Sequence, residues 1–349
     1  MEETSFFLTA ITEAYGQSPL ALTALRKHNP EGKQLYRVDF TVGPSWVMRA
    51  YHESHNLTDA FRFISGSQSL LEWLQGTAHT LSSMTNQGYP APTIIPSLTG
   101  ELVGTHQKWH MLVTTFVDGN AKDTSPEKMA ALGAALSQLH TLYLPEQSST
   151  DSEFALSWWS RTRLQEGSHR LRSAAPYVPQ EIQALYDACQ HTFDYFQHDS
   201  LLPQTLIHGD CWAENGVQAQ EGQTTLIDWE CAGLGLPILD FGSLLLHCHF
   251  DQRDKREHQA YPQYQPDPQR IAAVVQGYSR WRRLSTYESE ALLEAVRFSV
   301  TWRLAWFFSL LAKDTTNEWV QGALRRWQRW YAISEDIAHL AHETIGQAN

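Results

Sequence analysis

Two short apolar runs in the second half of the chain restrict the possible folds most strongly. Leu206-Ile207 is followed after two residues by Asp210, and Leu226-Ile227 is followed directly by Asp228. Asn215 lies between them, five residues after Asp210. Short apolar runs bounded by polar residues are typical of buried strands, and rigid strands present polar groups at their ends. We therefore expect the three polar side chains to meet in one cleft.

Two aspartates and an asparagine in this spacing suit phosphoryl transfer. One carboxylate takes the proton of the acceptor hydroxyl, while the amide and the second carboxylate offer oxygen atoms to Mg²⁺ on the nucleotide phosphates. Aspartate and asparagine are also common turn residues, so His-x-Asp-x-x-x-x-Asn alone arises by chance. The second strand-borne carboxylate, thirteen residues after Asn215, favours the functional interpretation.

The same residues resemble a known enzyme family. His208-Gly209-Asp210 with Asn215, followed by Ile227-Asp228-Trp229-Glu230, is similar to the motifs of the aminoglycoside phosphotransferase and choline kinase family. That family has the protein-kinase-like fold, with His-Gly-Asp in place of His-Arg-Asp and Asp-x-Glu in place of Asp-Phe-Gly. The resemblance covers roughly residues 20–310 and is strongest at 206–242.

The resemblance implies roles for individual residues. Asp210 would be the catalytic base, with Asn215 and Asp228 as the other catalytic residues and the Mg²⁺ ligands. Glu230 would help to orient the site. Asp240 matches a family aspartate that braces the catalytic loop, and an ordinary helix N-cap is the alternative interpretation of this residue.

The first hundred residues have the pattern of a small antiparallel sheet. Residues 20–25, 34–40 and 45–51 read as strands joined by short turns, after a short amphipathic helix within residues 1–17. The second strand alternates, with Tyr36 and Val38 on one face. These three strands predict an antiparallel meander.

In the family this meander belongs to the nucleotide-binding lobe. Arg49 holds the position of the strand cation that neutralises phosphate, where protein kinases carry lysine; a surface arginine on an edge strand is the alternative. The turn at 28–33, with Gly32, would cover the phosphates. A helix is expected at 67–84, in which Glu72 either pairs with Arg49 or is a solvated surface residue.

Two further strands are expected at 93–95 and 109–117, followed by a hinge between two lobes. By its position, this hinge would hydrogen-bond the adenine through the backbone around Thr115 and Val117. Beyond it the pattern is mainly helical, beginning with Ser125-Pro126, a cap followed by proline. His140, at the end of that helix, is interpreted as a structural contact.

Later helices are expected at 182–196, around 271–281, at 292–311 and at 319–340, with a Pro/Gln/Tyr-rich loop at 261–268. The sequence thus predicts an α+β, protein-kinase-like bilobal fold with a small antiparallel-sheet N-lobe and a larger, mainly helical C-lobe. The predicted domains are a nucleotide-binding lobe, 1–118, and a lobe with catalytic loop, metal site and acceptor pocket, 119–349. At 349 residues the chain is long enough for both.

Composition excludes several classes of protein. The net charge of −12 and the absence of a basic stripe argue against a nucleic-acid partner. The apolar stretch 292–311 contains three charged residues, which indicates a buried helix rather than a membrane span. Four widely separated cysteines and an acidic N-terminus without a signal-like segment favour a reduced cytoplasmic protein. The oligomeric state leaves no mark in the sequence.

The leading hypothesis is a small-molecule kinase that uses Mg²⁺ with ATP, or GTP, to phosphorylate a hydroxyl group. A non-catalytic nucleotide-binding regulatory module, in effect a pseudokinase, is the main alternative. A metal-dependent phosphoesterase using His208, Asp210 and Asp228 would need more ligands than the motif contains. Aromatic residues in the later helices suggest an amine-bearing acceptor through cation–π contacts. They are Trp281, Trp302, Trp306 and Phe307, with the Trp158-Trp159 segment.

Overall fold

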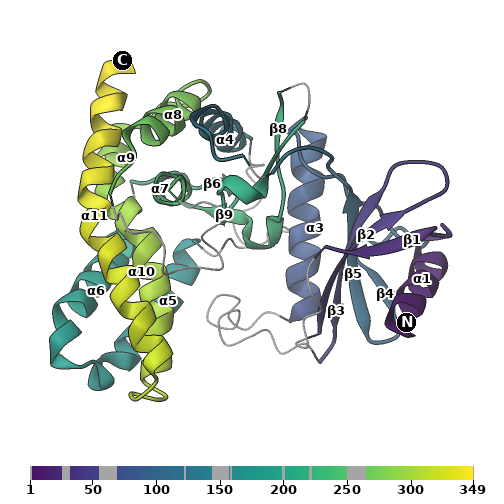
Figure 1. The fold of residues 1–349 in the computed structure, drawn as a ribbon, viewed down its shortest axis with the longest axis horizontal. Helices are drawn as coiled ribbons and strands as arrows, with labels where there is room; N and C mark the ends of the chain where they lie inside the picture. The colour runs from purple at the N-terminus through teal and green to yellow at the C-terminus, as the bar shows by residue number, and fades with distance from the viewer. Residues whose placement is uncertain are drawn as a thin grey trace. The chain divides into compact units, whose positions relative to one another are not determined.

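The computed structural model describes residues 2–25, 32–54, 69–121, 123–143, 157, 159–198, 201–219, 222–249 and 265–348. The described residues form two compact units, one ending at Asp118 and the other beginning at Gly119. The first is built on an antiparallel sheet and the second mainly on helices (Figure 1). This is the α+β architecture that the sequence predicts.

The first unit contains five antiparallel strands in the order β1-β2-β3-β5-β4. Its elements are α1 (Glu2–Tyr15), β1 (Ala21–Ala24), β2 (Lys33–Asp39), β3 (Trp46–His52), α3 (Leu70–Asn86), β4 (Gly104–His106) and β5 (Trp109–Thr115). The strand pairs β1–β2 and β2–β3 form the expected meander, with Tyr36 opposite Met48. Tyr36 and Val38 are buried between half-buried neighbours, as alternation requires.

Helices α1 and α3 pack on the two faces of this sheet. Helix α1 buries Phe7 and Ile11 in one core with Met48 of β3. Trp73 of α3 meets Tyr51 of β3 edge to face, with ring centroids 5.6 Å apart. Since Met48 and Tyr51 are three residues apart on one strand, their side chains point to opposite faces, and each face has its own helix.

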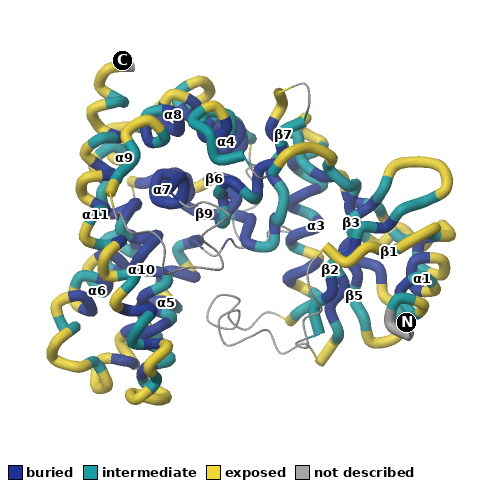
Figure 2. Tube along the Cα trace, viewed as in Figure 1, coloured by how far each residue is buried: buried dark blue, intermediate teal, exposed yellow. Residues whose placement is uncertain are grey.

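The second unit surrounds a helix that is buried along its whole length. Its helices are α4 (Pro126–Leu139), α5 (Arg161–Ala174), α6 (Gln183–His198), α7 (Pro237–His247), α8 (Pro268–Tyr278), α9 (Thr286–Glu290), α10 (Leu292–Leu311) and α11 (Glu318–Ala348). Every residue of α7 is buried, as its dark blue trace in Figure 2 shows. Gly242 lets α7 approach α10 closely, because a Cβ there would lie 2.5 Å from the carbonyl carbon of Ala295.

Four short strands in this unit form two small two-stranded sheets. They are β6 (Thr205–Ile207), β7 (Gly216–Gln218), β8 (Thr224–Leu226) and β9 (Gly233–Gly235), which pair as β6–β9 and β7–β8. Both pairs are antiparallel. Among the described helices, none is long and apolar enough to cross a membrane.

Several local predictions differ from the structure. The strand expected at 93–95 is reduced to one bridge between Ile94 and Thr114, and the strand expected at 109–117 ends at Thr115. Strand β4 was not predicted because three residues are too few for a periodic pattern. Helix α5 was not predicted because its composition is mostly polar.

Some predictions fall outside the described residues. They are the turn at 28–31, the first two residues of the helix expected at 67–84, Trp158 and the loop at 261–264.

Candidate active site

The position between β6 and Asp210 requires a glycine, Gly209. Its φ of +76° is a left-handed conformation that side chains disfavour. A Cβ at this position would lie 2.4 Å from the carbonyl oxygen of Cys231. The close approach of two backbone segments therefore explains the glycine in His-Gly-Asp.

Asn215 and Asp210 are in direct contact. The amide nitrogen of Asn215, Nδ2, donates to the Asp210 carboxylate oxygen Oδ2 at 2.9 Å and to the Asp210 backbone carbonyl at 2.8 Å. Asn215 is buried at the end of the short 3-10 helix Ala213–Asn215, which folds the chain back on itself. The two bonds hold the amide in one orientation and leave its oxygen, Oδ1, for another partner.

His208 connects the loop to the segment that carries the second carboxylate. The ring contacts the Ile227 carbonyl through Nε2 at 3.0 Å, and Nδ1 accepts from the Asp210 backbone N–H at 3.3 Å. Burial lowers the pKa of His208, so the ring is neutral with its proton on Nε2. His208 is thus a positioning residue between Asp210 and the residue before Asp228.

Asp228 is placed by its backbone. It lies between β8 and the 3-10 helix Trp229–Cys231, with φ +67° and ψ +57°. Left-handed conformations are uncommon for residues other than glycine and cluster at functional sites. The turn directs the residue after a buried strand toward the loop.

The two carboxylates influence each other electrostatically. Burial, and then the neighbouring Asp228 carboxylate, raise the pKa of Asp210 to about 7. The Arg303 guanidinium and the hydrogen bond from Asn215 oppose this shift. Asp210 is therefore a carboxylate that takes up a proton near neutral pH.

Asp240 braces the loop from beneath. Its fully buried carboxylate accepts from the backbone N–H groups of His208, at 2.7 Å, and Gly209, at 3.1 Å. It also contacts Nε2 of His140 at 3.2 Å. The N-cap residue of α7 is Leu236, so the helix-cap interpretation is wrong and the bracing one is confirmed.

Two cations near this loop were not predicted. Arg303 lies on α10 beside Asp210, with its guanidinium 4.9 Å from the ring centroid of Trp327. A charged residue in the middle of a mostly apolar helix is a usable signal, since its burial requires a partner. Lys128, fully buried on α4, donates to the carbonyls of Asn120, at 3.3 Å, and Gly216. No sequence pattern marks Lys128.

The residues expected to contact nucleotide lie in the first unit. Arg49 is half-buried on β3, and because β3 is the middle strand of the sheet, the edge-strand interpretation is wrong. Thr115 ends β5, and its N–H donates to the Thr93 carbonyl at 2.9 Å. Val117 follows two residues later and is half-buried. A ligand at Thr115 would meet its carbonyl, since the N–H is engaged.

Glu72 and Glu230 have different surroundings. Glu72 closes a capping box at the start of α3, where its Oε2 accepts from the Ser69 backbone N–H at 2.8 Å. Glu72 is exposed and caps its own helix, which agrees with the interpretation of Glu72 as a solvated surface residue. Glu230 is half-buried in the 3-10 helix directly after Asp228.

Comparison with known proteins decides the family. Residues 34–274, more than half of the chain, match the phosphotransferase enzyme family. The chain belongs to this family. The matched region contains the loop with Asp210 and Asn215, the turn with Asp228 and the strand with Arg49.

The phosphotransferase is similar to one curated protein in sequence and to solved structures in fold. It is 21% identical over 224 residues to a homoserine kinase of Hyphomonas neptunium, a match that spans 62% of this chain and 66% of that protein. An amicoumacin kinase in complex with AMP-PNP, Ca²⁺ and Ami superposes with a TM-score of 0.64 at 15% identity, over 96% of this chain and 93% of that one. A choline kinase of Streptococcus pneumoniae superposes with a TM-score of 0.56 at 12% identity, over 95% and 99%. The predicted family and fold class are confirmed.

Proposed function

We propose that this phosphotransferase transfers the γ-phosphoryl group of Mg·ATP, or GTP, to a hydroxyl group of a small acceptor. The observation that carries the proposal is the paired hydrogen bond from Asn215 to Asp210, in a loop braced by Asp240. Phosphoryl transfer depends mainly on positioning and on electrostatic stabilisation, and this loop is held rigidly for both.

Asp210 is the proposed catalytic base. Its carboxylate would orient the acceptor hydroxyl and take up its proton. The raised pKa of about 7 suits this role, because a general base works best when its pKa lies near the working pH. His208 and Asp240 act through the backbone of the loop and are proposed as positioning residues.

Asn215 and Asp228 fit a magnesium ion by the chemistry of their donors. The free Oδ1 of Asn215 and the Asp228 carboxylate are hard oxygen ligands, and the crowded negative charge at Asp210 and Asp228 favours a cation. No cluster of three or more His, Cys, Asp or Glu side chains suited to a metal occurs in the described part of the chain. Mg²⁺ takes few protein ligands beside water and phosphate, and when bound it would neutralise phosphate charge.

The first unit is proposed to bind the nucleotide, and the second to hold the catalytic loop and the acceptor. Arg49 would contact phosphate, since a planar guanidinium suits phosphate oxygens. The Thr115 carbonyl and the backbone of Val117 would contact the base. Because these contacts use the backbone, the identity of the side chains at Thr115 and Val117 does not tell whether the base is adenine or guanine.

The acceptor is proposed only as a hydroxyl-bearing small molecule. The amine was predicted from aromatic residues, but Trp302 is buried against Phe193 and Phe298, with centroids 6.0 and 5.8 Å away. Phe307 is also buried, whereas Trp281 is 58% exposed. The buried Trp302 and Phe307 cannot contact a cation, whereas the exposed Trp281 and the half-buried Trp306 can, so the amine-bearing acceptor stays a prediction.

A nucleotide and acceptor screen tests the proposal. Thermal unfolding with ATP or GTP, each with and without Mg²⁺, identifies the nucleotide. ADP or GDP release is then measured with homoserine, choline, amino alcohols, aminoglycosides, neutral sugars and nucleosides. We expect Mg²⁺-dependent stabilisation and release above the Asp210→Asn background with at least one acceptor. Nucleotide binding without release from any acceptor would favour the regulatory module instead.

A further inference from the structure

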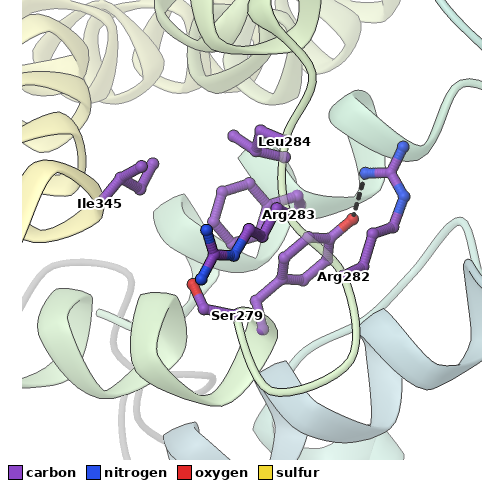
Figure 3. Close-up of a pocket in the computed structure, with 7 residues that line it drawn as sticks. Ser279, Arg282, Arg283, Leu284 and Ile345 are labelled. Carbon is purple, nitrogen blue, oxygen red and sulfur yellow. Dashed lines mark hydrogen bonds between the residues drawn. The ribbon is translucent and has the colours of Figure 1, made fainter. Parts of the chain in front are cut away.

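A cavity of about 340 Å³ lies in the second unit, at the ends of α8 and α11 (Figure 3). It is lined by Phe241, Tyr278, Ser279, Arg282, Arg283, Leu284 and Ile345. Three helices and the segment between α8 and α9 contribute these residues. The volume is in the range of sites for small organic ligands.

The lining combines positive charge with apolar surface. Arg282 and Arg283 are its charged groups, and none of its seven residues is acidic. Glu288 neutralises Arg282 through an ion pair of 2.6 Å, so the exposed Arg283 leaves the lining with net positive charge. Leu284 and Ile345 supply aliphatic surface, as Figure 3 shows.

Aromatic rings form another part of the lining. Phe241 and Tyr278 pack with their centroids 4.2 Å apart. Both rings are buried and form the floor beneath the cavity. The apolar body of a ligand would meet the half-buried Leu284 and Ile345, while its charged group would meet the exposed guanidinium of Arg283. A carboxylate suits a guanidinium because it accepts two parallel hydrogen bonds.

We propose that this cavity binds a small monocarboxylate with an apolar body and that its occupancy is transmitted to the loop that carries Asp210. The ligand is neither the phosphoryl donor nor the acceptor. The site is formed by residues that have no part in the proposed reaction.

A continuous chain of hydrogen bonds joins the cavity to the loop. Nη1 of Arg282 donates to the Tyr278 hydroxyl at 3.0 Å, and that hydroxyl lies 2.7 Å from Nδ1 of His140. Nε2 of His140 contacts Asp240 at 3.2 Å, and Asp240 accepts from the Gly209 N–H. The chain thus crosses from the cavity wall to the backbone of His-Gly-Asp.

The protons along this chain are ordered in one direction. Burial lowers the pKa of His140, which is therefore neutral. Asp240 is an acceptor, so the His140 proton is on Nε2, and Nδ1 accepts from the Tyr278 hydroxyl. Burial raises the pKa of Tyr278, which keeps this hydroxyl protonated. Each group in the chain therefore acts either as the donor or as the acceptor of a given bond. A ligand that shifts Arg282, which lines the cavity, would change the hydrogen bond from Arg282 to Tyr278 and then the bond from Tyr278 to His140.

Calorimetry of the full chain tests binding. The probes are phenylacetate, 2-phenylethanol and 2-phenylethylamine, which share a ring and differ in the polar group. We expect saturable binding of phenylacetate, at least about tenfold weaker binding of the other two, and about tenfold weaker phenylacetate binding in Arg283→Ala. Arg280→Ala, an exposed arginine outside the lining, is the matched control and should bind like the parent. Equal binding of the alcohol, no saturable phenylacetate binding, or equal losses in both arginine variants would overturn the site.

Hydrogen exchange at the His208 and Gly209 amides tests transmission without requiring turnover. Saturating phenylacetate should change their exchange rates in the parent by about threefold or more, which corresponds to a shift of roughly 0.65 kcal/mol in amide protection. Tyr278→Phe removes the hydroxyl between Arg282 and His140 but keeps the ring in the lining. This variant should bind phenylacetate and show no change at these amides. An unchanged parent, or a change that persists in Tyr278→Phe, contradicts the proposed route.

Discussion

The loop at 208–215 and the turn at 227–231 each present a carboxylate, but they are held in place by different means. Asp210 is positioned by hydrogen bonds that join residues distant in sequence, such as Asp240 to Gly209. Asp228 is positioned by a left-handed backbone conformation between β8 and a short helix. The loop therefore depends on a side-chain brace from α7, whereas the turn combines a left-handed residue with the contact of its Ile227 carbonyl to His208.

This difference predicts which substitutions disturb each segment. A change in the brace beneath the loop is expected to disturb Asp210 without touching it. The turn is sensitive to the residue that adopts the left-handed conformation. The following predictions, from the largest expected effect to the smallest, test that contrast.

Asp210→Asn is expected to reduce turnover by about 10²–10⁴-fold, because it removes the proposed general base and keeps the shape of the side chain. Nucleotide affinity should change little, since the proposed metal ligands remain. Steady-state turnover and nucleotide titration check both parts. Asp336→Asn, an exposed change on α11, is the control. Near-parental turnover would remove Asp210 from this role.

Gly209→Ala is expected to destabilise the fold by about 3 kcal/mol, through a left-handed φ combined with a backbone clash. Gly88 has nearly the same φ, +78°, but no atom within 4 Å of a Cβ. Gly88→Ala should therefore cost only about 1–2 kcal/mol. Urea unfolding of both variants separates the two contributions, and equal losses would show that the contact with Cys231 is unimportant.

Asp228→Ala and Asp228→Gly should both weaken Mg·nucleotide binding by about tenfold or more, because each deletes a charged ligand. Glycine accepts the left-handed conformation and alanine does not, so Asp228→Gly should be the more stable variant by about 1 kcal/mol. Calorimetry with and without Mg²⁺ measures the affinity, and thermal unfolding measures the stability. Parental affinity in either variant contradicts the metal assignment.

The pH dependence of stability gives the smallest effect. A carboxyl whose pKa is raised from its ordinary value to about 7 holds its proton more tightly in the folded state, so ionisation between about pH 4 and 7 destabilises the fold. Without nucleotide or metal, Asp210→Asn should therefore gain about 1 kcal/mol over the parent on going from pH 5 to pH 8, since water screens much of the shift. The same difference at both pH values would show that Asp210 has an ordinary pKa.

The sequence identified the group of polar side chains better than the residues that hold them in place. Asp210, Asn215 and Asp228 were identifiable because they follow short apolar runs at a spacing that chance seldom produces. The role of Asp240 needed the structure, since only the fold places its carboxylate under the Gly209 N–H. The contact between His140 and Tyr278 joins residues 138 positions apart, which no local pattern reveals.

The same reason explains the limits in the first unit. Alternation predicted β2 and β3 because one face of each of these strands is buried, whereas β4 is too short to alternate. The proposed contacts at Thr115 and Val117 use the backbone, which every residue shares. Arg303 could be recognised as one of three charged residues in a mostly apolar helix, but its proximity to Asp210 depends on how α10 packs.

The raised pKa of Asp210 has a consequence for the heat of binding. At pH 7 a fraction of the molecules carry a proton on this carboxyl. A cation held by Asn215 and Asp228 would offset the Asp228 charge, which is the second cause of the raised pKa after burial, and part of the bound proton would pass to the buffer. The heat of Mg·nucleotide binding at pH 7 should therefore vary with the ionisation enthalpy of the buffer in the parent. In Asp210→Asn this dependence on the buffer should disappear. The buffer dependence of the binding heat therefore reports whether a cation binds next to the Asp210 carboxyl.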